Sequence, residues 1–199
     1  MTEYCSVASC EGGEPIEGSA VARTAVWIVL EHRGPWGAKA VPESDLPDAV
    51  KQCLQAWEAA IEGARVQLVR RSGHAEGPLG FWLGVSDLAR PALVRWSLPS
   101  AQDVLSLDVP ALVEALRAGA PIEGAQPVEQ PLLLVCTNGR RDVCCSKWGV
   151  PVAHALAAEA GGVGWQWEAG SLRAPWLPIP ITYLVGTPPM APAQVQASA

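Results

Sequence analysis

The sequence predicts an α/β fold, because short apolar runs typical of buried strands alternate with longer segments of helical periodicity. The chain has 199 residues, of which 49% are hydrophobic and 17% are charged. A disordered chain would have fewer apolar and more charged residues. The length is sufficient for one α/β domain, or for two small ones, with a substantial core.

Five segments have the residue patterns of strands. Thr24–Glu31 is a short apolar run rich in β-branched residues, and Arg65–Arg70 alternates between apolar and polar residues. We expect three further strands, at Gly80–Val85, Leu93–Leu98 and Leu132–Val135, with a turn near Asp87–Pro91. The last of these strands is fully apolar, which indicates burial on both faces.

Three segments have the apolar spacing of helices. Glu43–Gly63 is the longest; Ser44 or Asp45 is expected to cap its start and Gly63 to end it. Asp103–Ala118 predicts a helix that is broken or begins near Pro110, and Val150–Ala160 predicts a helix begun by Pro151.

The connector Gly119–Pro131, which contains proline and glycine, divides the chain. We expect an N-terminal α/β half at 1–130 and a cysteine-bearing unit at 131–186, although the two can form one continuous domain. Ala174–Ala199 has no charged residue and six prolines among 26 residues, and only Ile179–Val185 keeps a regular pattern. We therefore expect 187–199 to be a disordered tail.

Charge and motifs exclude several function classes. The net charge is −6 and the basic residues are scattered, so nucleic-acid binding is not expected. No run of about 18 apolar residues predicts a membrane span, and the N-terminal residues do not resemble a secretory signal, so we expect a cytoplasmic protein. The chain contains no nucleotide-binding, HExxH or Ser-His-Asp pattern, so we assign no catalytic residue.

The six cysteines are therefore expected in a reducing compartment, where they act more often as ligands, redox thiols or packing groups than as disulfides. We interpret Cys53 as a core residue, because it lies within the helical pattern. Cys136 ends the apolar strand, and Cys145 follows nine positions later. A turn at Asn138-Gly139, where both residues tolerate a positive φ, would let the two sulfurs approach one metal centre.

The charges around this segment suit such a centre. Arg140, Arg141 and Lys147, together with a helix N-terminus, would offset the negative charge of thiolates and sulfides. Two other interpretations remain open: Cys144-Cys145 is a buried apolar pair, or one of the two is a redox-active thiol. The spacing matches neither a zinc knuckle nor a thioredoxin CxxC motif.

The segment CTNGRRDVCCSKWGVPVAHAL resembles the signature of the sucrase/ferredoxin-like family of thioredoxin-like [2Fe-2S] ferredoxins, which carry C-[ST]-x-G-x-R-D-x-x-C after a strand. EPIEGSA and WIVLEHRGPWGAKAVPESDL resemble it as well, and the likeness extends over roughly residues 4 to 165. It implies a thioredoxin-like fold and a [2Fe-2S] cluster bound by Cys136 and Cys145, with Cys144, Arg140 and Arg141 beside it. The chain would then be an electron carrier rather than an enzyme.

The histidine ligands of the family pattern are missing. Members supply two histidines from a later H-x3-H segment, but WEAGSLRAPW stands there in this chain. His32, His74 and His154 form no such pair, and His154 fits a helix-surface or packing role. Three explanations compete. The cluster was lost and the fold kept; Cys144, Cys5, Cys10 or a second subunit completes the site; or the reading frame shifts near Trp165.

These possibilities leave two functions open. The first is a [2Fe-2S] electron carrier that serves an unidentified redox partner protein, as a monomer or a homodimer. The alternative is a cluster-free thioredoxin-like protein that acts as a scaffold or through a redox-active thiol at Cys144 or Cys145.

Overall fold

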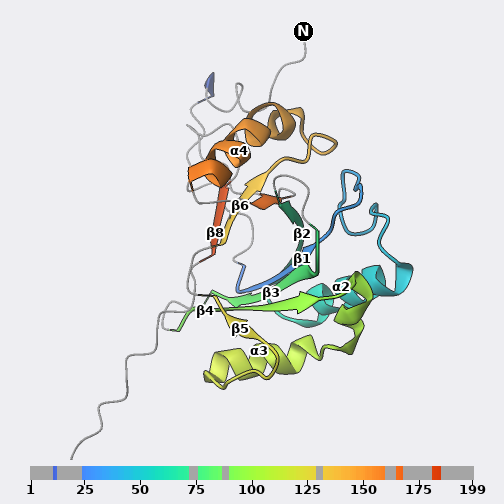
Figure 1. The fold of residues 1–199 in the computed structure, drawn as a ribbon, viewed down its shortest axis with the longest axis vertical. Coiled ribbons are helices and arrows are strands. Elements are labelled where there is room, and N and C mark those ends of the chain that lie inside the picture. Colours follow the sequence, from blue (N-terminus) through green and yellow to red (C-terminus); the bar gives the residue numbers. More distant parts are fainter. Residues whose placement is uncertain are drawn as a thin grey trace, which may run out of the picture.

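The computed structural model describes residues 11–12, 24–71, 76–86, 90–128, 132–159, 165–167 and 181–184. They form a mixed α/β structure around an eight-stranded sheet of order β5-β4-β3-β1-β2-β7-β6-β8 (Figure 1). Strands from both sides of residue 130 pair within this sheet. None of the described helices has the length and apolar character needed to cross a membrane.

The strands predicted in the first part of the chain are confirmed with small changes at their ends. β1 is Val26–Glu31, β2 is Ala64–Arg71, β3 is Leu79–Val85 and β4 is Ala92–Leu98. β1 and β2 run parallel, whereas β3 runs antiparallel to both β1 and β4. The short strand β5, Gln126–Pro127, lies within the expected connector and pairs with β4.

Helix α2, Asp48–Ala60, begins later than predicted, and neither expected cap is used. The Ser44 hydroxyl donates to Val41 O, and the Asp45 carboxylate lies against His32 instead. Pro47 precedes the first turn, and its ring disfavours helical geometry in the residue before it. Gly63, three residues beyond the end of α2, has a φ of 69°, which suits glycine.

The expected helix Asp103–Ala118 is two separate elements. The 3₁₀ helix η2, Ala101–Ser106, begins with a capping box in which Ser100 and Asp103 exchange hydrogen bonds. Helix α3, Val109–Ala118, starts at Asp108, whose side chain accepts from Ala111 N, and places Pro110 in its first turn. The expectation of a start near Pro110 is thus confirmed.

The main core lies between α2, α3 and one face of β1 to β4. It contains Phe81 and Leu68, and the side chains of Trp57, Phe81 and Trp96 lie in ring contact within it. Cys53 packs against this core as predicted, and burial raises the pKa of its thiol.

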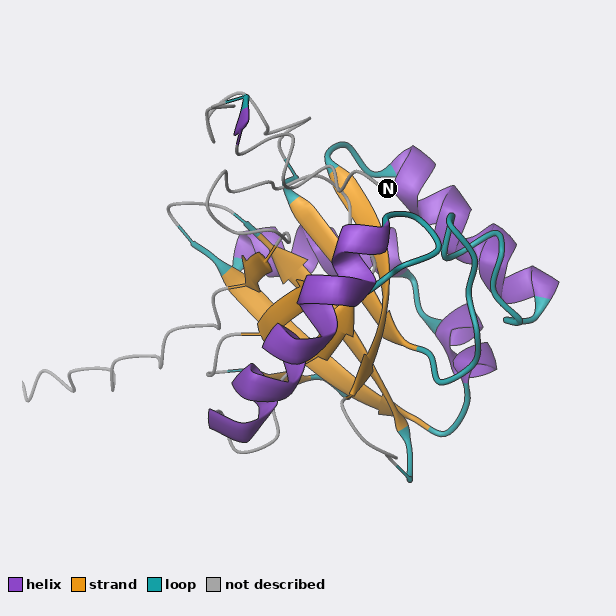
Figure 2. Ribbon diagram, turned by 90° about the horizontal axis from the view of Figure 1, so that it is seen from above, coloured by secondary structure: helices purple, strands orange, loops and turns teal. Residues whose placement is uncertain are grey.

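The cysteine-bearing part occupies the other end of the sheet. β6 is Leu132–Cys136, and it pairs in parallel with β7, Trp165–Trp167, and antiparallel with β8, Ile181–Leu184. The π-helical turn η3, Cys145–Gly149, leads into helix α4, Val150–Glu159, in agreement with the predicted helix as far as the described residues extend. Figure 2 shows α4 lying across the sheet, well separated from α2. The expected tail at 187–199, the turn residues 87–89, Cys5, Cys10 and His74 lie outside the described residues.

Candidate functional site

The candidate site is the connection between β6 and the helix that follows it. Cys136 is the last residue of β6 and is completely buried. The helix begins at Val143, earlier than expected, so Cys144 and Cys145 lie in its first turn and not in a loop before it. Both are buried, with exposed fractions of 2% and 3%. The turn η3 packs against β6, so the strand end and the first helical turns lie together.

Asp142 caps this helix. Its carboxylate accepts from Cys144 N at 2.9 Å, and its carbonyl oxygen accepts from Cys145 N at 3.0 Å. Since the first amides of a helix have no partner within the helix, such a cap satisfies donors that would otherwise be unpaired. The preference for Asp just before a helix start identifies this role from the sequence, whereas the predicted start at Val150 follows from Pro151.

The turn between the cysteines forms at the expected residues but for a different reason. Asn138 O accepts from both Arg141 N and Asp142 N, and the Asn138 side chain accepts from Arg140 N at 3.2 Å. Gly139 does not have a positive φ; a Cβ placed on it would lie 2.5 Å from Ser146 Cβ. Glycine is required there because the turn packs directly against the helix.

A buried hydrogen bond ties the turn to a distant loop. The Asn138 side-chain amide donates to Gly37 O at 2.9 Å, across 101 residues of sequence, and Asn138 is only 4% exposed. The loop that carries Gly37 is itself fixed by Trp36, over whose ring the Arg70 guanidinium lies at 3.6 Å from the centroid. Arg70 also donates to Gly34 O at 3.1 Å. Sequence patterns gave no signal for this contact, because it depends on the tertiary fold.

His32 and Asp45, near the two ends of the same loop, also contact each other. His32 Nε2 lies 2.6 Å from Asp45 Oδ1, while its backbone N donates to Val69 O. Burial lowers the pKa of His32, and the nearby Asp45 carboxylate opposes this shift only in part. The predicted site residues are therefore supported through Asn138, which the sequence placed in the turn, and through Gly37, Trp36 and His32, whose contacts with this region the sequence did not predict.

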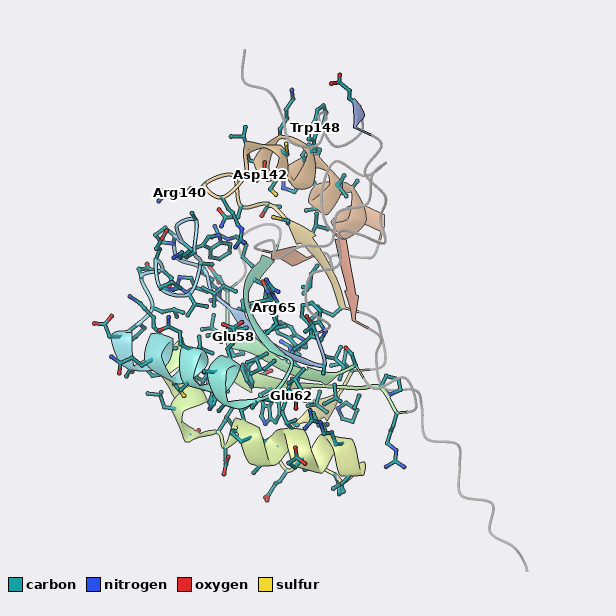
Figure 3. The ribbon with its side chains drawn as sticks, turned by 180° about the vertical axis from the view of Figure 1, so that it is seen from behind. Glu58, Glu62, Arg65, Arg140, Asp142 and Trp148 are labelled. Carbon is teal, nitrogen blue, oxygen red and sulfur yellow. The ribbon has the colours of Figure 1, made fainter. Side chains whose placement is uncertain are left out.

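The remaining predicted residues lie at the surface. The Arg140 and Arg141 side chains are exposed on the turn, as is His154 on α4, in agreement with its expected helix-surface role. Figure 3 shows Arg140 and Asp142 where the turn enters the helix, far from Glu58 on α2 and from Glu62 just after it. Within the described part of the chain, no group of three or more His, Cys, Asp or Glu side chains is arranged to hold a metal ion.

The donor chemistry of the site can be compared with that of an iron–sulfur cluster. A [2Fe-2S] cluster takes four protein ligands, mainly thiolates, with imidazoles in some cases. Cys136 and Cys145 are both buried, and Cys145 lies in the first turn of a helix, whose N-terminus favours negative charge. Two thiolates would be half of the four ligands that such a cluster needs.

Comparisons of the chain with models of known protein families, with curated proteins and with solved structures found no match.

Proposed function

We propose that the chain is an electron carrier of the sucrase/ferredoxin-like type, with a thioredoxin-like fold and a [2Fe-2S] cluster whose ligands include Cys136 and Cys145. One observation carries this proposal: a short turn connects a buried cysteine at the end of a strand with a buried cysteine in the first turn of the following helix. The resemblance of CTNGRRDVCCSKW to the family signature supports the same two ligands.

The remaining ligands come from beyond the described residues in this proposal. Cys5 and Cys10 form a C-x4-C pair that offers two further thiolates of the right chemistry. When bound, the cluster would accept and release one electron at a time. The chain's own contribution is to hold two thiolates in a dry environment and to fix their backbone through Asp142 and Asn138.

Serine substitutions test the assignment of ligands. The full chain and its Cys136→Ser, Cys145→Ser and Cys53→Ser variants would be produced with cluster assembly intact and purified without oxygen. Visible absorption and circular dichroism of the cluster should be lost in the first two variants and unchanged in Cys53→Ser, since Cys53 packs against the main core. A cluster that survives both Cys136→Ser and Cys145→Ser would refute the assignment.

A cluster-free function is a second candidate. Hydrogen bonds of Asn138 and Asp142 fix the cysteine turn without any bound group, so the turn can also serve as a scaffold or a redox-active thiol site. In the part of the chain that the structure describes, Cys136, Cys144 and Cys145 are not linked in disulfides. Alkylation followed by mass spectrometry, on protein that contains no iron, would show whether Cys144 or Cys145 reacts faster than Cys53, as this candidate requires.

A further inference from the structure

The surface above the cysteine turn has an unusual composition. Three large apolar side chains are strongly exposed among the described residues, and two of them, Val143 at 49% and Trp148 at 37%, lie on the first turns of the cysteine helix. The third, Leu105, is on η2. Exposed apolar groups that gather beside a candidate site indicate an interaction surface more strongly than isolated ones.

Three exposed basic residues lie on the same turn and helix start as these two apolar groups. Arg140, Arg141 and Lys147 are all exposed, and Lys147 Nζ lies 4.7 Å from the centroid of the Trp148 ring. The close packing of Gly139 on Ser146 brings the turn that carries the arginines beside this helix. We refer to Arg140, Arg141, Val143, Lys147 and Trp148 as the Trp148 patch.

The sign of the charge differs between the segment that carries the patch and the whole chain. From Thr137 to Val150 there are three basic residues and one acidic residue, Asp142, whose carboxylate accepts from the backbone at the helix start. The full chain has a net charge of −6. A cluster of positive side chains on an acidic protein favours one orientation in which an anionic surface can bind.

The helical part of the patch lies on the same first turns as Cys144 and Cys145. In a helix, residues four or five apart are one turn apart, so Trp148 lies one turn from Cys144, and Lys147 lies one turn from Val143. Figure 3 places Trp148 and Arg140 at the same end of the molecule as the helix start. A partner seated here would contact the helical turns that carry Cys144 and Cys145.

We propose that the Trp148 patch is the docking surface for an acidic redox protein that exchanges electrons with the cysteine site. The electron exchange in this inference rests on the proposed function, whereas the docking itself does not. In each encounter, the reduced centre of one protein gives one electron to the oxidised centre of the other. No covalent bond forms or breaks, and no proton is transferred. Carboxylates of the partner pair with Arg140, Arg141 and Lys147, while Trp148 and Val143 enter an apolar area.

Charge argues against two other occupants. A second copy of this chain, docked symmetrically, would bring like charges from both patches together. A nucleic acid would use the arginines but would leave Val143 without an apolar partner, since phosphate contacts dominate such complexes. An acidic protein surface can offer carboxylates to the basic residues of the patch and an apolar area to Val143 and Trp148.

Docking can be tested without a cluster. The full chain would be mixed with cytochrome b5, an acidic redox protein, and in parallel with cytochrome c, a basic one, and titrated at low and high salt. We expect a complex with cytochrome b5 that weakens at least tenfold on adding salt, and a carbodiimide cross-link at Lys147. The net charge of −6 alone would favour cytochrome c, and preferential binding of cytochrome c would overturn the proposal.

Charge reversal locates the surface. Arg140→Glu/Lys147→Glu should weaken cytochrome b5 binding at least tenfold, whereas Arg117→Glu, on the distant helix α3, should change it less than twofold. Trp148→Ala should weaken binding without changing its salt dependence. Equal effects of both charge changes, or binding of duplex DNA stronger than that of cytochrome b5, would contradict the proposal.

A second readout needs no partner. Subtracting the fluorescence of Trp148→Phe from that of the full chain isolates Trp148 from the other tryptophans. Iodide should quench this component several-fold better than caesium does, and the opposite order would overturn the proposed local charge. Because neither measurement depends on iron, failure of docking is distinguishable from failure to bind a cluster.

Discussion

The two ends of the sheet are stabilised in different ways. Around β1 to β4, 24 buried apolar side chains form one continuous cluster with α2 and α3. Around α4, the described residues provide a small cluster in which Val135 and Ala153 are buried, and polar contacts at Asn138 and Asp142 hold the turn. β6 also contributes Leu132 and Leu134 to a second apolar cluster with β1 to β4. Among the described residues, specific polar contacts thus stand out at the candidate site, whereas the first part shows extensive apolar burial.

The largest expected effect is in the main core. Phe81 is fully buried and contacts Trp57 and Trp96, so Phe81→Ala should lower the free energy of unfolding by about 3–5 kcal/mol. Leu105→Ala, at a position 47% exposed, should change it by less than about 0.5 kcal/mol. Chemical denaturation of both variants checks the pair, and equal losses would contradict the assigned core.

A smaller effect is expected where the turn meets the helix. Gly139→Ala should cost about 1–3 kcal/mol, because the added Cβ would lie 2.5 Å from Ser146 Cβ. Hydrogen exchange should show the loss in residues 137–149 and not in β1 to β4. The double variant Gly139→Ala/Ser146→Gly should recover part of the loss, and no recovery would show that the contact is not its cause.

The two helix caps allow a matched comparison between the regions. Asp142→Ala and Asp108→Ala each remove a side chain that accepts from a first-turn amide, and each should cost about 0.5–2 kcal/mol. Asp108→Ala should lower the stability of the α3 core, whereas Asp142→Ala should mainly increase the alkylation rates of Cys144 and Cys145. Asparagine at either position should restore most of the loss. If the alkylation rates of Cys144 and Cys145 were unchanged in Asp142→Ala, the cap would not be what protects these cysteines.

The smallest expected effect is a pH dependence through His32. Burial lowers the pKa of His32 in the folded chain below its unfolded value of about 6.5, so the unfolded chain binds more protons between the two values. Stability should be constant with respect to this group above pH 6.5 and should fall as the pH decreases from there towards the folded pKa. His32→Gln should reduce the slope of unfolding free energy against pH over this range, and an unchanged slope would assign it to other groups.

Several features of the fold could be predicted because they depend on local pattern. The strands β1 to β4 and the core position of Cys53 follow from apolar periodicity, and the start of α3 follows from Asp108 and Pro110. The start of α2 was wrong because Ser44 and Asp45, both good capping residues, have tertiary or loop partners instead. Local propensity cannot distinguish a cap from such a contact.

The cysteines of the candidate site could be predicted from the sequence, but the contacts that hold the turn in place could not. Cys136, Cys144 and Cys145 follow from the segment itself, and the structure buries all three. The bond from Asn138 to Gly37 and the stacking of Arg70 on Trp36 join segments far apart in sequence. Asp142 indicates the observed helix start at Val143, whereas Pro151 favours the later start that was predicted at Val150.

The most direct test of the proposed function is the iron and acid-labile sulfide content of the full chain, produced with cluster assembly intact and purified without oxygen. We expect a reddish-brown protein with iron and sulfide in equal amounts, two of each per cluster. A colourless chain free of iron and sulfide, while still folded by circular dichroism, would contradict the account and leave the cysteine turn as a scaffold or thiol site.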